Sequence, residues 1–275
     1  MHDLQAEDIT INCDPKERLK KITCFALDMD GTIYLGRQWI EGAREFLDAV
    51  TAKGKEYVFV TNNSSKNAAV YVEKLRCMGL DTGPEKIITS GQATIAYLNQ
   101  HFSGKRVFLM GNDLLKEEFA QAGVNLCEER PDLVVTAFDT SLDYAKLCKV
   151  CDYVRSGMPY LATHPDYNCP TETGMIPDIG SFHELIHASA FRYPDRIIGK
   201  PNKEIMDYLI KRTGAVKETT AMVGDRLYTD VAAGVHNGFT GILVLSGEAR
   251  LTDVKESAVQ PHLIFDSVRQ MIPYL

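Results

Sequence analysis

The stretch ITCFALDMDGT, residues 22–32, decides the fold because two carboxylates follow an apolar run directly. The run over residues 22–27 predicts a buried strand that ends where Asp28 and Asp30 begin. Residues i and i+2 of a strand point to the same face, so two like charges are expected side by side. Such a pair is unfavourable without nearby cations. The stretch therefore predicts a functional site at the end of a buried strand.

Apolar runs rich in β-branched residues alternate with helical patterns along the chain. A helix over residues 41–53 has Phe46, Leu47 and Val50 on one face, and a second is expected over 67–78. Further strands are expected at residues 56–60, 86–89, 106–110, 133–136, 159–163, 220–223, 241–245 and 262–265. Apolar strands between amphipathic helices predict an α/β fold, with a Rossmann-like parallel sheet covered on both faces.

These strands are too many for one compact sheet. Turn-rich segments, DTGP at residues 81–84 and YPD at residues 193–195, border the middle of the chain. We therefore expect a discontinuous catalytic core, residues 1–84 and 195–275, with an α/β cap inserted at residues 85–194.

Bulk properties exclude several classes of protein. The 275 residues carry a net charge of −7, which disfavours binding to nucleic acid. No run approaches 18 apolar residues, so no membrane span is expected, and the polar residues 1–21 do not read as a secretory signal. Seven scattered cysteines suggest reduced thiols and a cytoplasmic protein.

Polar clusters follow two further predicted strands, TNNSS at residues 61–65 and GDRLYTD at residues 224–230, and IGKP at residues 198–201 precedes a helix. In parallel α/β sheets the active crevice lies at the carboxyl ends of the strands. Asp28, Asp30, Asp225 and Asp230 would bring four negative charges into that crevice. Carboxylate and carbonyl oxygens suit Mg²⁺, and Lys200 adds a positive charge. The crevice would thus attract a phosphate dianion.

The chemistry suggests separate roles for these side chains. Asp28 can be the nucleophile that takes up a phosphoryl group, and Asp30 can be the general acid and base. The Thr61 hydroxyl and backbone N–H groups near Asp30, Gly31 and Asn62 can bind the transferring oxygens. Asp225 would be a metal ligand, and Asp230 would orient Lys200 or the metal-bound waters.

Taken together, DMDGTI (28–33), TNN (61–63), GKP (199–201) and GDRLYTD (224–230) resemble the motifs of haloacid dehalogenase superfamily phosphatases. Their spacing is similar to the 4-nitrophenylphosphatase or NagD-like branch, which carries a large C2-type α/β cap between the second and third motifs. The resemblance covers nearly the whole chain from about Ile22. The loop ATHPD, residues 162–166, with Gly180 and Ser181, resembles the cap loop of that branch.

The resemblance implies site residues. Asp28 would be the nucleophile and Asp30 the acid and base, and Mg²⁺ would lie on the Asp28 and Asp225 carboxylates and the Asp30 backbone carbonyl. The phosphate contacts would be Thr61, Lys200, Asn62 and Asn63. Candidates for substrate specificity in the cap are Asp166, Tyr167, Asn168, Thr171 and Glu172. The branch also implies a homodimer formed through the cap.

The presence of Asp30 favours phosphate ester hydrolysis over dehalogenation. Dehalogenating members of the superfamily lack an acid at this position because halide leaves without a proton, whereas an alkoxide needs one. The sequence therefore predicts a Mg²⁺-dependent phosphatase of small phosphomonoesters, of the sugar phosphate, phosphoglycolate, glycerol phosphate or nucleotide type. It would act through an aspartyl-phosphate. A phosphotransferase or phosphomutase would use the same motifs, and a non-catalytic phosphate-binding module could share the fold.

Two short patterns suggest other metal chemistry. HELIH, residues 183–187, matches the zinc signature HExxH. The alternative is a cap helix with Ser181 as its N-cap, His183 and His187 half-exposed, and Leu185 and Ile186 packed. CKVC, residues 148–151, has the spacing of a metal or redox pair but lies in a predicted helix without a second pair, so packing is the simpler interpretation.

Overall fold

The computed structural model describes residues 14–171 and 173–275. Contacts within the chain divide it into two compact units. Unit 1 comprises Met1–Thr61, Lys74–Ile88 and Leu209–Leu275, and unit 2 comprises Asn62–Glu73 and Thr89–Tyr208. Within the described residues, no helix has the length and apolar character needed to cross a membrane.

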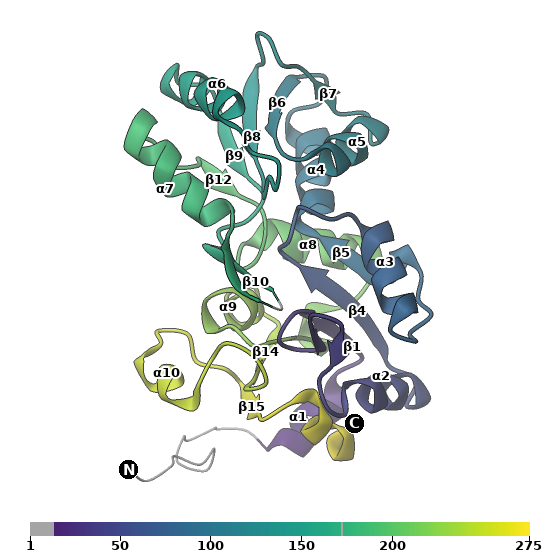
Figure 1. The fold of residues 1–275 in the computed structure, drawn as a ribbon. Helices are drawn as coiled ribbons and strands as arrows, with labels where there is room; N and C mark the ends of the chain where they lie inside the picture. The colour runs from purple at the N-terminus through teal and green to yellow at the C-terminus, as the bar shows by residue number, and fades with distance from the viewer. Residues whose placement is uncertain (1–13, 172) are drawn as a thin grey trace. The chain divides into compact units, whose positions relative to one another are not determined.

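Unit 1 is built on a six-stranded sheet with the order β15-β14-β13-β1-β4-β5 (Figure 1). The pairs β1–β13, β1–β4, β13–β14 and β14–β15 are all parallel. The strands are β1 (Cys24–Leu27), β4 (Glu56–Thr61), β5 (Ile87–Thr89), β13 (Thr220–Gly224), β14 (Thr240–Val244) and β15 (Leu263–Phe265). The expected α/β fold with a parallel sheet is confirmed.

The helix expected over residues 41–53 follows the predicted periodicity. In α2 (Ala43–Ala52), the side chains of Phe46, Leu47 and Val50 are buried, as expected. The helix stops before Gly54, which has a φ of +69° that favours glycine. The other helical segments are α1 (Pro15–Lys21), a π-helical turn (Leu227–Val231), α9 (Ala232–His236), α10 (Leu251–Glu256) and the 3-10 helices Pro84–Lys86, Lys217–Thr219 and Val268–Tyr274. Two helices, α3 (Ala68–Cys77) and α8 (Lys203–Thr213), have residues in both units.

Unit 2 has its own five-stranded parallel sheet, with the order β12-β9-β8-β6-β7. The strands are β6 (Arg106–Met110), β7 (Asn125–Leu126), β8 (Leu133–Thr136), β9 (Tyr160–Ala162) and β12 (Arg196–Ile197). One apolar cluster joins the sheet to α4 (Ser90–His101) and α5 (Asp113–Gln121), and another joins it to α6 (Tyr144–Arg155) and α7 (Ile179–Ala190). Alternate residues of β6 enter the two clusters, Val107 the first and Phe108 the second, so helices cover both faces of this sheet.

Two short antiparallel hairpins complete the fold. They pair β2 (Tyr34–Leu35) with β3 (Gln38–Trp39), and β10 (Asn168–Thr171) with β11 (Gly174–Pro177). Neither was expected from the sequence. In β11 all four residues are exposed, so the alternation of buried and exposed positions that marks a strand is missing.

The start of α7 differs from the prediction. The N-cap is Asp178, whose side chain accepts a hydrogen bond from the Ile179 N–H, and not Ser181. His183 is buried rather than half-exposed, and Leu185 is exposed rather than packed, whereas Ile186 is buried as expected. Because the helix begins three residues earlier, the expected N-cap Ser181 lies within the helix.

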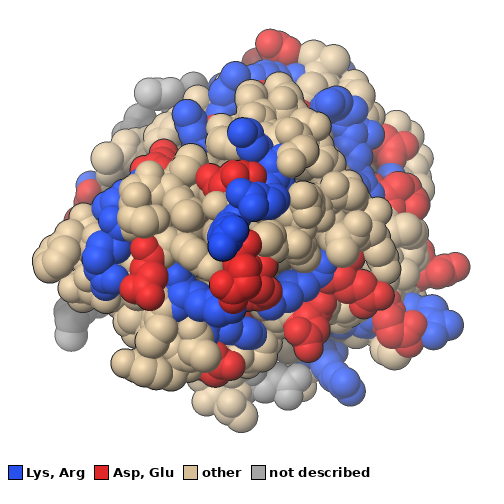
Figure 2. All heavy atoms as spheres, turned by 90° about the horizontal axis from the view of Figure 1, so that it is seen from above, with Lys and Arg blue, Asp and Glu red and all other residues tan. Residues whose placement is uncertain are grey.

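Charged side chains are mixed on the face of the molecule shown in Figure 2. Lys and Arg lie among Asp and Glu there, without a broad area of either sign.

Candidate active site

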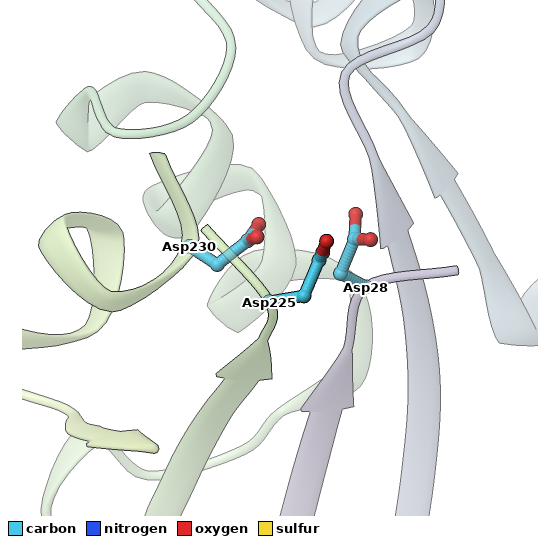
Figure 3. Close-up of side chains that lie close together, drawn as sticks. All are labelled: Asp28, Asp225 and Asp230. Atoms are coloured by element: carbon cyan, nitrogen blue, oxygen red, sulfur yellow. The ribbon is translucent and has the colours of Figure 1, made fainter. Parts of the chain in front are cut away.

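Three aspartates meet at the carboxyl ends of two neighbouring strands of unit 1. Asp28 follows β1, Asp225 follows β13, and Asp230 lies in the π-helical turn. One carboxylate oxygen from each side chain lies within 4.8 Å of the other two. Figure 3 shows the three side chains lying close together beyond the ends of these strands. The parallel pairing of β1 with β13 brings Asp28 and Asp225 together although they are 197 positions apart in the sequence.

The Asp225 carboxylate is held on several sides. Its Oδ2 accepts the Glu248 N–H at 2.8 Å, and its Oδ1 accepts the Thr32 hydroxyl at 3.4 Å. A Cβ atom at Gly31 or at Gly247 would collide with this carboxylate, so both positions require glycine for close approach. The segment after β14 therefore fixes the end of β13.

Two of the three aspartates are deeply buried, and Asp28 is partly buried. Asp225 and Asp230 are 3% and 1% exposed, and Asp230 Oδ2 accepts the Arg226 N–H at 3.1 Å. Burial, and then the neighbouring Asp230 carboxylate, raise the pKa of Asp225 well above its usual range. Buried like charges of this kind call for a compensating cation.

The donor set fits a hard divalent cation. All three side chains offer carboxylate oxygens, which Mg²⁺ and Ca²⁺ prefer. This is the one group of three or more His, Cys, Asp or Glu side chains that could hold a metal within residues 14–171 and 173–275. The Asp30 side chain is outside this group; the family resemblance implies the Asp30 backbone carbonyl, and not its side chain, as a metal ligand.

Asp30 has a lysine beside it that sequence reasoning missed. The Lys74 Nζ lies 3.8 Å from Asp30 Oδ1 and 3.6 Å from the centre of the Tyr34 ring. The turn after Asp30 is fixed by the Gly31 N–H, which donates to the Tyr34 carbonyl, and by the Ser246 hydroxyl, which donates to the Gly31 carbonyl. Lys74 belongs to the amphipathic pattern of α3, so nothing local distinguished it.

The predicted phosphate contacts fall in both units. Thr61 is the buried last residue of β4 in unit 1, whereas Asn62, Asn63 and Lys200 belong to unit 2. The Asn62 side chain bonds to the main chain of Lys200. Asn63 Oδ1 accepts hydrogen bonds from the N–H and the hydroxyl of Ser65.

The HExxH pattern does not form a metal site. His183 Nε2 bonds the Thr136 hydroxyl at 3.2 Å inside unit 2, while the His187 ring stacks on Tyr193 at 4.0 Å. The Glu184 carboxylate accepts hydrogen bonds from two tyrosine hydroxyls. The second short pattern lies in α6, with Cys148 exposed and Cys151 buried, as packing predicts. Of the specificity candidates in the cap, Glu172 lies outside the described residues.

Comparisons with known proteins agree with the fold. Residues 25–125 match the family described as haloacid dehalogenase-like hydrolase, and residues 197–271 match a related HAD-hydrolase-like family. A curated relative, the acid sugar phosphatase of Staphylococcus aureus (strain USA300), is 34% identical over 258 residues, which is 94% of this chain and 99% of that protein.

Two solved structures extend the comparison. The 4-nitrophenylphosphatase from Thermotoga maritima superimposes with a TM-score of 0.89 and 44% identity, covering 93% of this chain and 98% of that one. A glycerol phosphate phosphatase from Mycobacterium tuberculosis, solved in complex with calcium, gives a TM-score of 0.84 and 27% identity, covering 92% of this chain and 75% of that one.

Proposed function

Because the chain belongs to the haloacid dehalogenase-like hydrolase family and is a phosphatase of that family, we propose that it hydrolyses small phosphomonoesters through an aspartyl-phosphate on Asp28, with Mg²⁺ as its cation. The observation that carries this proposal is the meeting of Asp28, Asp225 and Asp230 at the ends of β1 and β13. This arrangement offers a nucleophile and a cation site at the same place.

The first half-reaction transfers the phosphoryl group. A carboxylate oxygen of Asp28 attacks phosphorus and forms a new P–O bond, while the bond from phosphorus to the ester oxygen breaks. Asp30, in its protonated form, gives its proton to the departing ester oxygen, so the alcohol leaves neutral. The Asp28 carboxylate is now an acyl phosphate, and Asp30 is a carboxylate.

The second half-reaction restores the enzyme. Asp30 takes a proton from a water molecule whose oxygen attacks the phosphorus of the aspartyl-phosphate. The P–O bond to Asp28 breaks, and inorganic phosphate leaves. Asp28 returns as a carboxylate and Asp30 returns protonated, so protons and electrons balance over the cycle.

The cation would be held by the Asp28 and Asp225 carboxylates and by the Asp30 backbone carbonyl, with Asp230 orienting the bound waters. When bound, Mg²⁺ offsets the negative charge of the aspartates and of the phosphate. The fit of three clustered carboxylates to a hard cation supports this assignment.

The remaining assignments follow the motifs. Thr61 and Lys200 would contact the phosphate, with the segment of Asn62 and Asn63 lining its site. The catalytic core would comprise residues 1–84 and 195–275, and residues 85–194 would form the cap that selects the substrate. Sugar phosphate and glycerol phosphate are the first candidates, because relatives are named for acid sugar phosphatase and glycerol phosphate phosphatase activity; phosphoglycolate and nucleoside monophosphates complete the panel, to be compared by kcat/KM.

The test of the mechanism is the Asp28→Asn variant. An amide is a poor nucleophile, so turnover of 4-nitrophenyl phosphate should fall by at least about a thousandfold while the fold is kept, as followed by circular dichroism. Asp48→Asn, an exposed change on α2, is the matched control. A near wild-type rate in Asp28→Asn would refute the aspartyl-phosphate. EDTA should inhibit and added Mg²⁺ should restore activity; insensitivity to excess chelator would refute the metal assignment.

We also propose a cytoplasmic homodimer that forms through residues 85–194. Free cysteines at all six described positions support a reducing compartment. Exposed apolar side chains in unit 2, Met175, Leu185 and Phe191, support an interface between copies. Light scattering after gel filtration should give twice the chain mass, and a monomer at micromolar concentration would contradict the dimer.

A further inference from the structure

We propose that Asn62 is a positioning residue for Lys200, acting through its side chain on the lysine main chain rather than on the phosphate, and that Asp166 orients Asn62 for this task. The inference rests on the proposed function, in which the Lys200 ammonium contacts the phosphate. It changes the role of Asn62 from ligand to support.

The Asn62 side-chain amide forms hydrogen bonds with both main-chain polar groups of Lys200. Its Oδ1 accepts the Lys200 N–H at 2.7 Å, and its Nδ2 donates to the Lys200 carbonyl at 3.0 Å. The partners fix the orientation of the amide, because a backbone N–H can only donate and a carbonyl can only accept. Asn62 and Lys200 are 3% and 2% exposed, so water does not substitute readily for these bonds.

The second hydrogen of the amide is also in use. Asn62 Nδ2 donates to Asp166 Oδ1 at 3.2 Å, and Asp166 is itself buried, with its backbone carbonyl accepting the Gly180 N–H at 2.8 Å. Both amide hydrogens are therefore engaged inside unit 2. The Asn62 side chain therefore has no amide hydrogen left to donate to the phosphate.

The residue before the lysine is shaped for this contact. Gly199 donates its N–H to the Thr163 carbonyl at 2.7 Å. A Cβ atom on Gly199 would lie 2.6 Å from Asn62 Oδ1 and 2.7 Å from the Thr163 oxygen, closer than real Cβ atoms approach. Glycine at position 199 thus lets the Lys200 peptide reach the Asn62 amide.

Fixing the main chain matters for a lysine. Its ammonium sits on a flexible four-carbon stem, so the position of its Cα determines which volume the charge can reach. A site that binds a phosphate in a defined orientation needs supports that lock the contacting residues. Asn62 holds the main chain of Lys200 in this way, although the two residues are 138 positions apart in the sequence.

A double-mutant cycle tests the inference. Asn62→Ala, Lys200→Met and the double variant are compared by the inhibition constant of inorganic phosphate against 4-nitrophenyl phosphate. If Asn62 acts through Lys200, each single change should weaken phosphate binding tenfold or more, and the double variant should bind no worse than Lys200→Met. Asn67→Ala is the matched control: Asn67 Oδ1 accepts the Val70 N–H at the start of α3, and its loss should leave the constant unchanged.

The outcomes separate the two levels of the proposal. If the losses of phosphate affinity in Asn62→Ala and Lys200→Met multiply in the double variant, Asn62 binds phosphate independently and the inference is overturned. Unchanged binding in Asn62→Ala beside weakened binding in Lys200→Met would overturn it too. Unchanged binding in Lys200→Met would instead refute the lysine assignment of the proposed function. Should Asn62→Ala fail to fold, Asp166→Ala replaces it in the same cycle. Asp166→Ala should weaken phosphate binding by a smaller factor, and the double variant with Lys200→Met should again bind phosphate no worse than Lys200→Met alone.

Discussion

At the scale of single residues, Asp30 has a lysine beside it. The Lys74 ammonium, which lies over the Tyr34 ring, is 3.8 Å from the Asp30 carboxylate. In the proposed mechanism Asp30 transfers protons and Asp28 attacks phosphorus. A proton donor is needed most when the leaving group is a strong base, and this dependence gives a test that is specific to Asp30.

Asp30→Asn should therefore slow alkyl phosphates more than aryl phosphates. We expect kcat/KM for glycerol phosphate to fall by about 10²–10⁴-fold, as is typical for losing a general acid, and kcat/KM for 4-nitrophenyl phosphate to fall clearly less. The quantity kcat/KM is chosen because it covers the steps up to the departure of the alcohol and not the later hydrolysis. Equal losses for both substrates would contradict the assignment of Asp30 as the acid.

The residues of the candidate site could be predicted only where they belong to a local pattern. Asp28 and Asp225 stand out because each follows an apolar run directly. Lys74 and Glu248 reach their places by tertiary folding, from a helix and from the loop after β14, and no local pattern marks them. Asn62 was noticed, but its bonds to Lys200 depend on a contact between distant segments.

At the scale of secondary-structure elements, α7 shows how one cap residue changes an interpretation. Starting the helix at Ile179 turns His183 inward, where its Nε2 bonds the Thr136 hydroxyl of β8. Burial, and then the nearby His164, lower the pKa of His183 to about 3, with Glu184 opposing the change. The unfolded chain restores a pKa of about 6.5, so folding keeps this ring neutral at pH values where it would otherwise be charged.

His183 should therefore make stability fall in acid. Between about pH 6.5 and pH 3 the unfolded state binds a proton that the folded state does not, so the free energy of unfolding falls as the pH falls, by up to about 1.4 kcal/mol per pH unit from this group. Urea unfolding of His183→Asn at pH 7, 6 and 5 should show a shallower decline than the wild type. The exposed His236→Asn should keep the wild-type decline. Equal slopes for wild type and His183→Asn would contradict the argument.

Most strands could be predicted because buried parallel strands are continuous apolar runs. Residues 106–110 and 133–136 match β6 and β8 at both ends, and the other predicted strands differ by one or two residues at an end. The hairpin of β10 and β11 was missed because its strands contain Pro170 and Pro177 and are partly or fully exposed. Its pairing comes from the chain around it, and not from a hydrophobic pattern of its own.

At the scale of the whole molecule, the acidic cluster that the proposed function needs lowers the stability of the fold. Asp28, Asp225 and Asp230 bring three carboxylates together, two of them almost fully buried, in a protein that already carries a net charge of −7. Buried like charges lower the free energy of unfolding unless a cation offsets them. Sites of this kind are kept for function at the expense of stability. Neutralising a single aspartate should therefore raise the free energy of unfolding of the metal-free protein.

Asp225→Asn should separate these two effects by opposite changes. Without added metal, the variant should unfold at the same temperature as the wild type or higher, because the relief of repulsion offsets the loss of one hydrogen bond, worth about 1 kcal/mol. With Mg²⁺ at a hundred times its dissociation constant, the wild type should gain about 2.7 kcal/mol, and the variant should gain far less. The control Asp48→Asn removes an exposed carboxylate and should keep the full Mg²⁺ response. A full Mg²⁺ response in Asp225→Asn would show that Asp225 does not bind the cation. A large loss of stability without metal would show that the hydrogen bonds from Glu248 and Thr32 to the Asp225 carboxylate stabilise the fold by more than the charge repulsion destabilises it.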